Sequence, residues 1–204
     1  MHHMIKAGIF DIGGVLIDWN NEWLFQDVDQ TLHISSNLRA KFWHSPMKLL
    51  EIGEITESEF WQRLIEDTKA SGELPEESLL LRKFEKEFHI NQQVVRIARE
   101  LKSKDFQVAV LSNTISPHSK FMRSTHLFDL FKPVVLSNEV GVAKPNADIY
   151  QLVLKKLKLS PEEVFFVDDR PENVEGANRV GIHGILYKDP QTLREVLKKL
   201  GVNL

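Results

Sequence analysis

Four short polar segments that follow apolar runs constrain this chain more than any other feature. They are FDIGG around Asp11, LSN around Ser112, GVAKP around Lys144 and VDD around Asp168 and Asp169. Continuous apolar runs are typical of parallel strands that are buried on both faces. Ligands of open α/β sheets bind where such strands end. We therefore expect three carboxylates, a hydroxyl and an ammonium to meet at one edge of a sheet, which is chemistry suited to a phosphate and a divalent cation.

The segment between the first two strands has a helical pattern. Apolar residues recur three and four positions apart over residues 20–33, 35–50, 56–69 and 75–88. Ser36, Thr56 with Glu59 three residues later, and Pro75 mark expected helix starts. This block of about 70 residues is interpreted as an insertion above the sheet edge.

After residue 91 the pattern alternates between helix and strand. Strands are expected at 5–10, 107–111, 134–136, 164–167 and 183–187, and helices at 92–103, 146–157, 172–180 and 191–200. The predicted fold class is α/β: a doubly wound, mostly parallel, Rossmann-like sheet with an inserted helical cap. The predicted core covers residues 1–17 and 91–204, and the predicted cap covers residues 18–90.

Composition favours an enzyme that acts on a small molecule. The net charge of −3 with interspersed signs offers no basic face for nucleic acid. No apolar run approaches the ~20 residues of a membrane span, and no signal-peptide pattern is seen, so the cytoplasm is the expected compartment. The absence of cysteine excludes disulfides and thiolate zinc sites. The sequence does not indicate an oligomeric state.

Asp11 and the acidic pair have specific chemical interpretations. Gly13 and Gly14 follow Asp11 and allow a ligand to approach the backbone closely. An aspartate is already ionised at pH 7, so Asp11 can act as a nucleophile once the negative charge of a phosphate is neutralised. Asp168 and Asp169 repel each other unless a cation lies nearby, and hard oxygen ligands suit Mg²⁺.

The order and flanks of these motifs resemble the haloacid dehalogenase superfamily over nearly the whole chain. The resemblance implies that Asp11 forms an aspartyl-phosphate, and that Ser112 and Lys144 hold the phosphoryl oxygens, with Asn113 sharing the donor role. It also implies a Mg²⁺ ion held by Asp11, the Gly13 carbonyl and Asp169, with Asp168 acting directly or through water. These inferences make Asp11, Ser112 and Lys144 the catalytic candidates.

One position departs from the family pattern. Phosphatases of the superfamily usually carry an Asp two residues after the nucleophile, as general acid and base, and here that residue is Gly13. General acid–base help is worth about 10²–10⁴ in rate. The loss favours substrates with good leaving groups, such as anomeric phosphates. The overall pattern is most similar to a subgroup that includes bacterial α-D-glucose-1-phosphate phosphatases.

Two alternatives remain open at the level of the sequence. A metal-free 2-haloacid dehalogenase would share Asp11 and Lys144 but would lack the acidic pair. A non-catalytic phosphate-binding module descended from a phosphatase would explain Gly13. In the cap, the aromatic residues are expected to be mostly core. The segment 42–54 contains Pro46 and Gly53, is expected to interrupt the helical pattern, and supplies His44 as the candidate cap contact to substrate.

Overall fold

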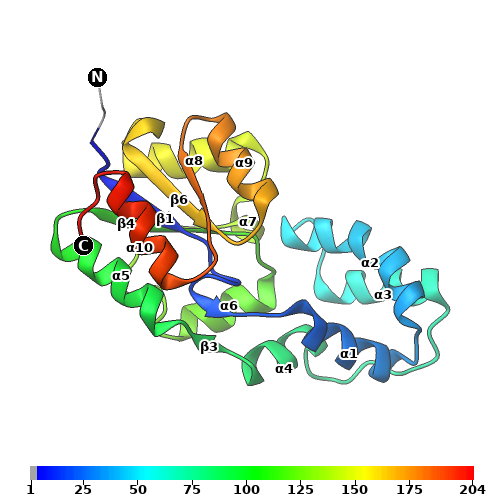
Figure 1. Cartoon of the computed structure of the whole chain (residues 1–204). Coiled ribbons are helices and arrows are strands. Elements are labelled where there is room, and N and C mark those ends of the chain that lie inside the picture. Colours follow the sequence, from blue (N-terminus) through cyan, green and yellow to red (C-terminus); the bar gives the residue numbers. More distant parts are fainter. Residues whose placement is uncertain (1–3) are drawn as a thin grey trace.

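The computed structural model describes residues 4–204, except for the side chains of Asn21 and Trp23. A five-stranded parallel sheet has the order β5-β4-β1-β6-β7, which confirms the predicted fold class (Figure 1). Its strands are β1 (Ala7–Phe10), β4 (Gln107–Ser112), β5 (Val134–Leu136), β6 (Val164–Asp168) and β7 (His183–Leu186). β1 lies at the centre, with β4 on one side and β6 on the other.

Helices cover both faces of this sheet. On one face, Phe10 and Phe165 belong to a core that includes residues of α5 (Gln92–Ser103), α6 (Ser116–Ser124) and α10 (Pro190–Lys199). On the other face, Ile9 and Phe166 pack with α8 (Ala147–Leu157) and α9 (Pro171–Arg179). Successive strand residues point to opposite faces, so β1 and β6 supply both cores and are buried throughout. Two short elements, α7 (Ser137–Val140) and a 3₁₀ turn η1 (Pro161–Glu163), complete this part of the chain.

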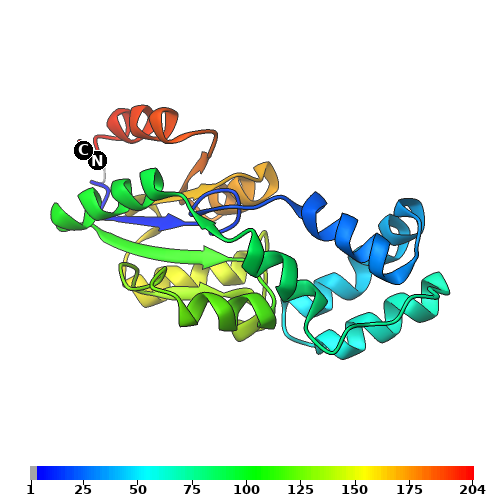
Figure 2. The ribbon, with the colours of Figure 1, turned by 90° about the horizontal axis from the view of Figure 1, so that it is seen from below.

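A separate bundle of four helices lies to one side of the sheet (Figure 2). It contains α1 (Asn21–Leu32), α2 (Ser36–Glu51), α3 (Glu57–Thr68) and α4 (Leu79–Lys86). The chain enters and leaves the bundle through two antiparallel strands, β2 (Ile17–Asp18) and β3 (His89–Ile90). In the described part of the chain, no helix combines the length and the apolarity needed to cross a membrane. The exact division into core and cap stays a prediction.

The interior of the bundle is aromatic, as expected. Trp43, Phe60 and Trp61 are buried and pack edge to face, with centroids 4.8–6.1 Å apart. The Trp23 side chain, also expected in this core, lies outside the described residues. Edge-to-face aromatic pairs add about 0.5–1.5 kcal/mol of stability beyond what the burial of their surface area contributes. The bundle therefore has a core of its own, and Phe84 of α4 also packs into the core on one face of the sheet.

Two predicted features of the bundle are wrong. Helix α4 begins at Leu79 rather than at Pro75, because Ser78 accepts a hydrogen bond from the Leu81 amide and caps the helix. Helix α2 continues through Pro46, which is buried, and ends only at Glu51. Pro46 lacks an N–H group and so leaves one helical hydrogen bond unmade, and its burial offsets that loss. The predicted capping box of Thr56 and Glu59 is confirmed.

Candidate active site

The predicted polar residues meet at the carboxyl edge of the sheet. Phe10 pairs with Val110 of β4 and with Val167 of β6. The residues that end or directly follow these strands therefore lie at one edge, and they include Asp11, Ser112 and Asp168. We call Asp11, Ser112, Lys144, Asp168 and Asp169 the carboxyl-edge residues.

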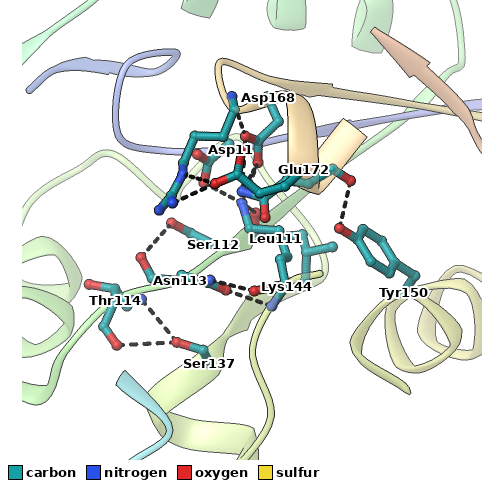
Figure 3. Close-up of polar contacts among 12 residues, drawn as sticks. Asp11, Leu111, Ser112, Asn113, Thr114, Ser137, Lys144, Tyr150, Asp168 and Glu172 are labelled. Carbon is teal, nitrogen blue, oxygen red and sulfur yellow. Dashed lines mark hydrogen bonds and ion pairs between the residues drawn. The ribbon is translucent and has the colours of Figure 1, made fainter. Parts of the chain in front are cut away.

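Lys144 connects the two buried carboxylates of this group. Its ammonium lies 2.8 Å from Asp11 Oδ1 and 2.6 Å from Asp168 Oδ2, and it donates to the Leu111 carbonyl at 3.1 Å (Figure 3). Burial acts to lower the pKa of Lys144, but the charges of Asp11 and Asp168 outweigh it, so the pKa is raised. Lys144 is therefore a fixed positive charge between two negative ones.

Asp168 is fully buried and has a partner on each oxygen. Its Oδ1 accepts from the Arg170 amide at 2.9 Å, and the Asn173 side-chain amide donates to both oxygens at 3.1 Å. The hydroxyl of Tyr150 donates to the Asn173 carbonyl at 2.7 Å. These contacts fix Asp168 in orientation, and Asp168 in turn orients the Lys144 ammonium.

The three carboxylates could hold a metal ion. Asp11, Asp168 and Asp169 each offer an oxygen within 4.8 Å of the others. Asp11 Oδ1 is buried, and its partner is the Lys144 ammonium at 2.8 Å. Three carboxylates against one ammonium leave an excess of two formal negative charges, which a divalent cation would balance. The donor set, all oxygen, fits Mg²⁺.

The pKa values of Asp11 and Asp169 are both raised, which agrees with an excess of negative charge at this site. Burial raises the pKa of Asp11 to about 6, although the charge of Lys144 opposes the shift. Burial, followed by the charge of Asp168, raises the pKa of the more exposed Asp169. Gly14 adopts φ +74°, and the Asp169 carboxylate occupies the place that a Cβ atom would need there. Glycine is therefore required at position 14 for both reasons.

Asn113, directly after β4, contacts the backbone around Lys144. Its side-chain amide donates to the Lys144 carbonyl at 2.9 Å and accepts from the Lys144 amide at 2.8 Å. These two bonds hold the backbone of the GVAKP segment. Ser112 is buried at the strand end, and its hydroxyl donates weakly to the Asn113 carbonyl at 3.3 Å. A substrate contact from Ser112 or Asn113 stays a prediction.

Gly13 and His44 are the remaining predicted residues. An added Cβ on Gly13 would meet only Trp19, at 3.8 Å and beyond, so the space beside the Gly13 Cα is open. His44 is exposed on α2, and its contact with substrate stays a prediction.

Two residues near the carboxyl edge were missed by sequence reasoning. Ser137 is fully buried, and its hydroxyl accepts from the Thr114 amide at 2.9 Å and donates to the Glu51 carbonyl at 2.6 Å. Ser137 follows the apolar run of β5, so the same strand-end pattern could have found it. Glu51 ends α2, and no local pattern marks it.

A sequence model of the haloacid dehalogenase-like hydrolases matches residues 5–181. The chain belongs to the haloacid dehalogenase-like hydrolases. A sesquiterpene phosphatase of Aspergillus oryzae is 30% identical over 186 residues, which cover 90% of each chain. Bifunctional epoxide hydrolase 2 of Sus scrofa is 29% identical and matches 98% of this chain, which spans only 40% of that longer protein.

A solved structure of the family also resembles this hydrolase. It is an enzyme from Bacteroides thetaiotaomicron in complex with magnesium and inorganic phosphate, with a TM-score of 0.74 and 26% sequence identity. The alignment covers 90% of this chain and 94% of the other. Phosphatases are therefore among the relatives of this hydrolase, and a related fold binds both magnesium and phosphate.

Proposed function

We propose that the chain is a Mg²⁺-dependent phosphomonoester hydrolase of small phosphorylated metabolites. The observation that carries the proposal is the cluster of Asp11, Asp168 and Asp169 around one buried ammonium at the carboxyl edge. The net negative charge of this cluster would repel a phosphate, so substrate binding requires a cation there. When bound, Mg²⁺ would neutralise the phosphoryl oxygens and keep the Asp11 carboxylate ionised.

In the proposed mechanism Asp11 is the nucleophile. One carboxylate oxygen of Asp11 attacks phosphorus, the bond to the leaving oxygen breaks, and an aspartyl-phosphate forms. Water then attacks phosphorus, the bond to Asp11 breaks, and inorganic phosphate leaves. Lys144 holds Asp11 in place, and the Lys144 ammonium and the Ser112 hydroxyl stabilise charge on the phosphoryl oxygens. Asp11, Gly13, Asp169 and Asp168 are the proposed metal ligands.

The same proposal assigns the helical insertion, residues 18–90, as a cap that selects the substrate. Sugar phosphates such as glucose 1-phosphate are the proposed substrate class, because a hemiacetal oxygen departs more easily than an alkoxide. This choice rests on Gly13, where no side chain can protonate the leaving group. The same feature favours the second candidate, a phosphate-binding module without turnover.

A screen of phosphorylated metabolites with Mg²⁺ or with a chelator tests the proposal. We expect inorganic phosphate to be released from at least one sugar phosphate with Mg²⁺ and not with the chelator. Turnover that persists with the chelator would instead favour metal-free chemistry, such as dehalogenation. Binding of phosphate without turnover of any ester would favour the binding module.

A further inference from the structure

The open space at Gly13 raises the question of which group handles the leaving-group proton. An Asp at this position would fit, because its Cβ would meet only Trp19 at ordinary contact distance. The core therefore leaves the place for an acid beside Asp11 vacant. A proton donor from the bundle could serve instead, provided that part of the bundle is fixed to the carboxyl edge.

The end of α2 is fixed to the core in this way. The Ser137 hydroxyl joins the Glu51 carbonyl to the Thr114 amide, and Thr114 lies two residues after Ser112. The turn that follows α2 also packs on the core. Gly53 has φ +73°, and a Cβ there would run into the Asn138 carbonyl, so only a glycine allows this approach. These contacts link the end of α2 to the loop that follows Ser112 at the end of β4.

The Glu51 carboxyl lies within electrostatic reach of the carboxyl edge. Its positively charged neighbours are Arg170 and Lys144 from the core and Lys48 from its own helix. Burial raises the pKa of Glu51, although these three cations oppose the shift. A carboxyl group whose pKa is raised is better suited to act as a general acid than an ordinary one. In contrast, Glu54 in the following turn is exposed.

We propose that Glu51 is the general acid and base of this hydrolase, delivered by the bundle to replace the side chain that Gly13 lacks. The inference rests on the proposed phosphatase function. In the first step, the bond from phosphorus to the leaving oxygen breaks, and that oxygen takes the proton of the Glu51 carboxyl. In the second step, the attacking water gives a proton to the Glu51 carboxylate as the bond to Asp11 breaks. Glu51 is then protonated again, and phosphate and alcohol have been released.

This role changes the expected substrates. Gly13 alone predicts poor turnover of alkyl phosphates and an initial burst of alcohol release, because neither step has proton help. With Glu51 in place, alkyl phosphates, including those of primary sugar hydroxyls, turn over steadily.

The test is Glu51→Gln, measured on a series of aryl and primary alkyl phosphates. We expect kcat/KM for alkyl phosphates to fall by about 10²–10⁴, and aryl phosphates, whose leaving groups need little protonation, to change by no more than about threefold. The decline of wild-type kcat/KM as the pH rises through the pKa of Glu51 should also disappear in the variant. Glu54→Gln, in the turn that follows α2, is the matched control and should behave like the wild type.

A rescue experiment separates proton transfer from structure. Adding Gly13→Asp to Glu51→Gln should restore alkyl turnover, because the new carboxyl fills the open space beside Asp11. Glu51→Asp keeps a shorter acid and should fall between the wild type and Glu51→Gln. An equal loss of kcat/KM for all esters in Glu51→Gln would overturn the role of Glu51, and so would the absence of rescue by Gly13→Asp. Neither result would affect the proposed phosphatase function as long as the wild-type protein hydrolyses phosphate esters. If the wild type hydrolysed no phosphate ester, the proposed function would fall first.

Discussion

The carboxyl edge of the sheet and the interior of the α1–α4 bundle are both buried, but they are built from opposite kinds of side chain. At the edge, Asp11, Lys144 and Asp168 are charged and at most 6% exposed. In the bundle, the interior is mostly aromatic and aliphatic, and its one buried cation among the described residues, Arg39, pairs with Asp29. A buried charge depends on its specific partner, because its desolvation is offset only by that partner. An apolar core tolerates changes that conserve volume. The carboxyl edge therefore depends on specific pairs of charged residues, whereas the bundle depends on the volume of its apolar core.

The largest expected effect is on activity, from a change that leaves the fold intact. Asp11→Asn removes the nucleophile but keeps the size of the side chain, so kcat/KM for phosphate esters should fall by about 10³ or more. Asp105→Asn, in the exposed turn before β4, is the matched control and should retain activity. Circular dichroism should show native folding for both variants. Wild-type turnover in Asp11→Asn would refute the assignment of the nucleophile.

Lys144→Met tests whether the edge depends on matched charges. The variant leaves Asp11 and Asp168 without their buried cation, and we expect the free energy of unfolding to fall by about 3–5 kcal/mol. The loss should be greater at pH 8 than at pH 5, because a carboxyl that has taken up a proton no longer repels its neighbour. Urea unfolding at the two pH values measures this, with the exposed Lys156→Met as control. Equal stability of Lys144→Met and wild type at pH 8 would contradict the comparison.

His118 tests the junction between the bundle and helix α6, which packs on the sheet. It is buried on α6, stacks on Phe84 of α4 at 3.8 Å, and its Nε2 lies 2.9 Å from the Leu80 carbonyl. Burial lowers the pKa of His118 from 6.5 to about 4. The unfolded chain therefore binds a proton that the folded chain does not between these values, and stability falls as the pH drops from 6.5 towards 4.

The size of this loss of stability follows from the shift in the pKa of His118. It amounts to about 3 kcal/mol once the pH is near 4. His118→Gln can keep a donor for the Leu80 carbonyl but does not titrate, so its free energy of unfolding should depend less on pH over this range. The exposed His126→Gln is the control. Parallel pH curves for His118→Gln and wild type would show that His118 does not contribute this dependence.

The smallest expected effect is a gain in stability at the edge. Burial and the charge of Asp168 raise the pKa of Asp169, so Asp169→Asn should relieve repulsion when no metal is bound. We expect its melting temperature without Mg²⁺ to rise by a few degrees, on the order of 1 kcal/mol. Saturating Mg²⁺ should raise the melting temperature of the wild type and have little effect on the variant. A lower melting temperature of Asp169→Asn without Mg²⁺ would mean that this carboxylate is already compensated.

Much of the carboxyl edge could be predicted because its information is local. The apolar runs before Asp11, Ser112 and Asp168 identify buried parallel strands, and parallel strands bring their ends together. The helices of the bundle could also be predicted from local information, namely the periodicity of apolar residues and the capping box at Thr56. Two predictions based on proline were wrong. Pro46 was expected to interrupt a helix, but it is buried inside α2. Pro75 was expected to begin a helix, but Ser78 caps α4 three residues later.

The sequence by itself determined the α/β class, the helical insertion and the residues that line the sheet edge, because strand and helix patterns repeat over a few residues. Only the tertiary structure decided how those residues are paired. Asn113 binds the backbone around Lys144, 31 residues away in the chain, and Ser137 binds the end of α2, 86 residues away. Such contacts depend on the packing of distant elements and on which donors remain unpaired after folding. No local pattern carries that information, and it is the reason why Glu51 was found only in the folded structure.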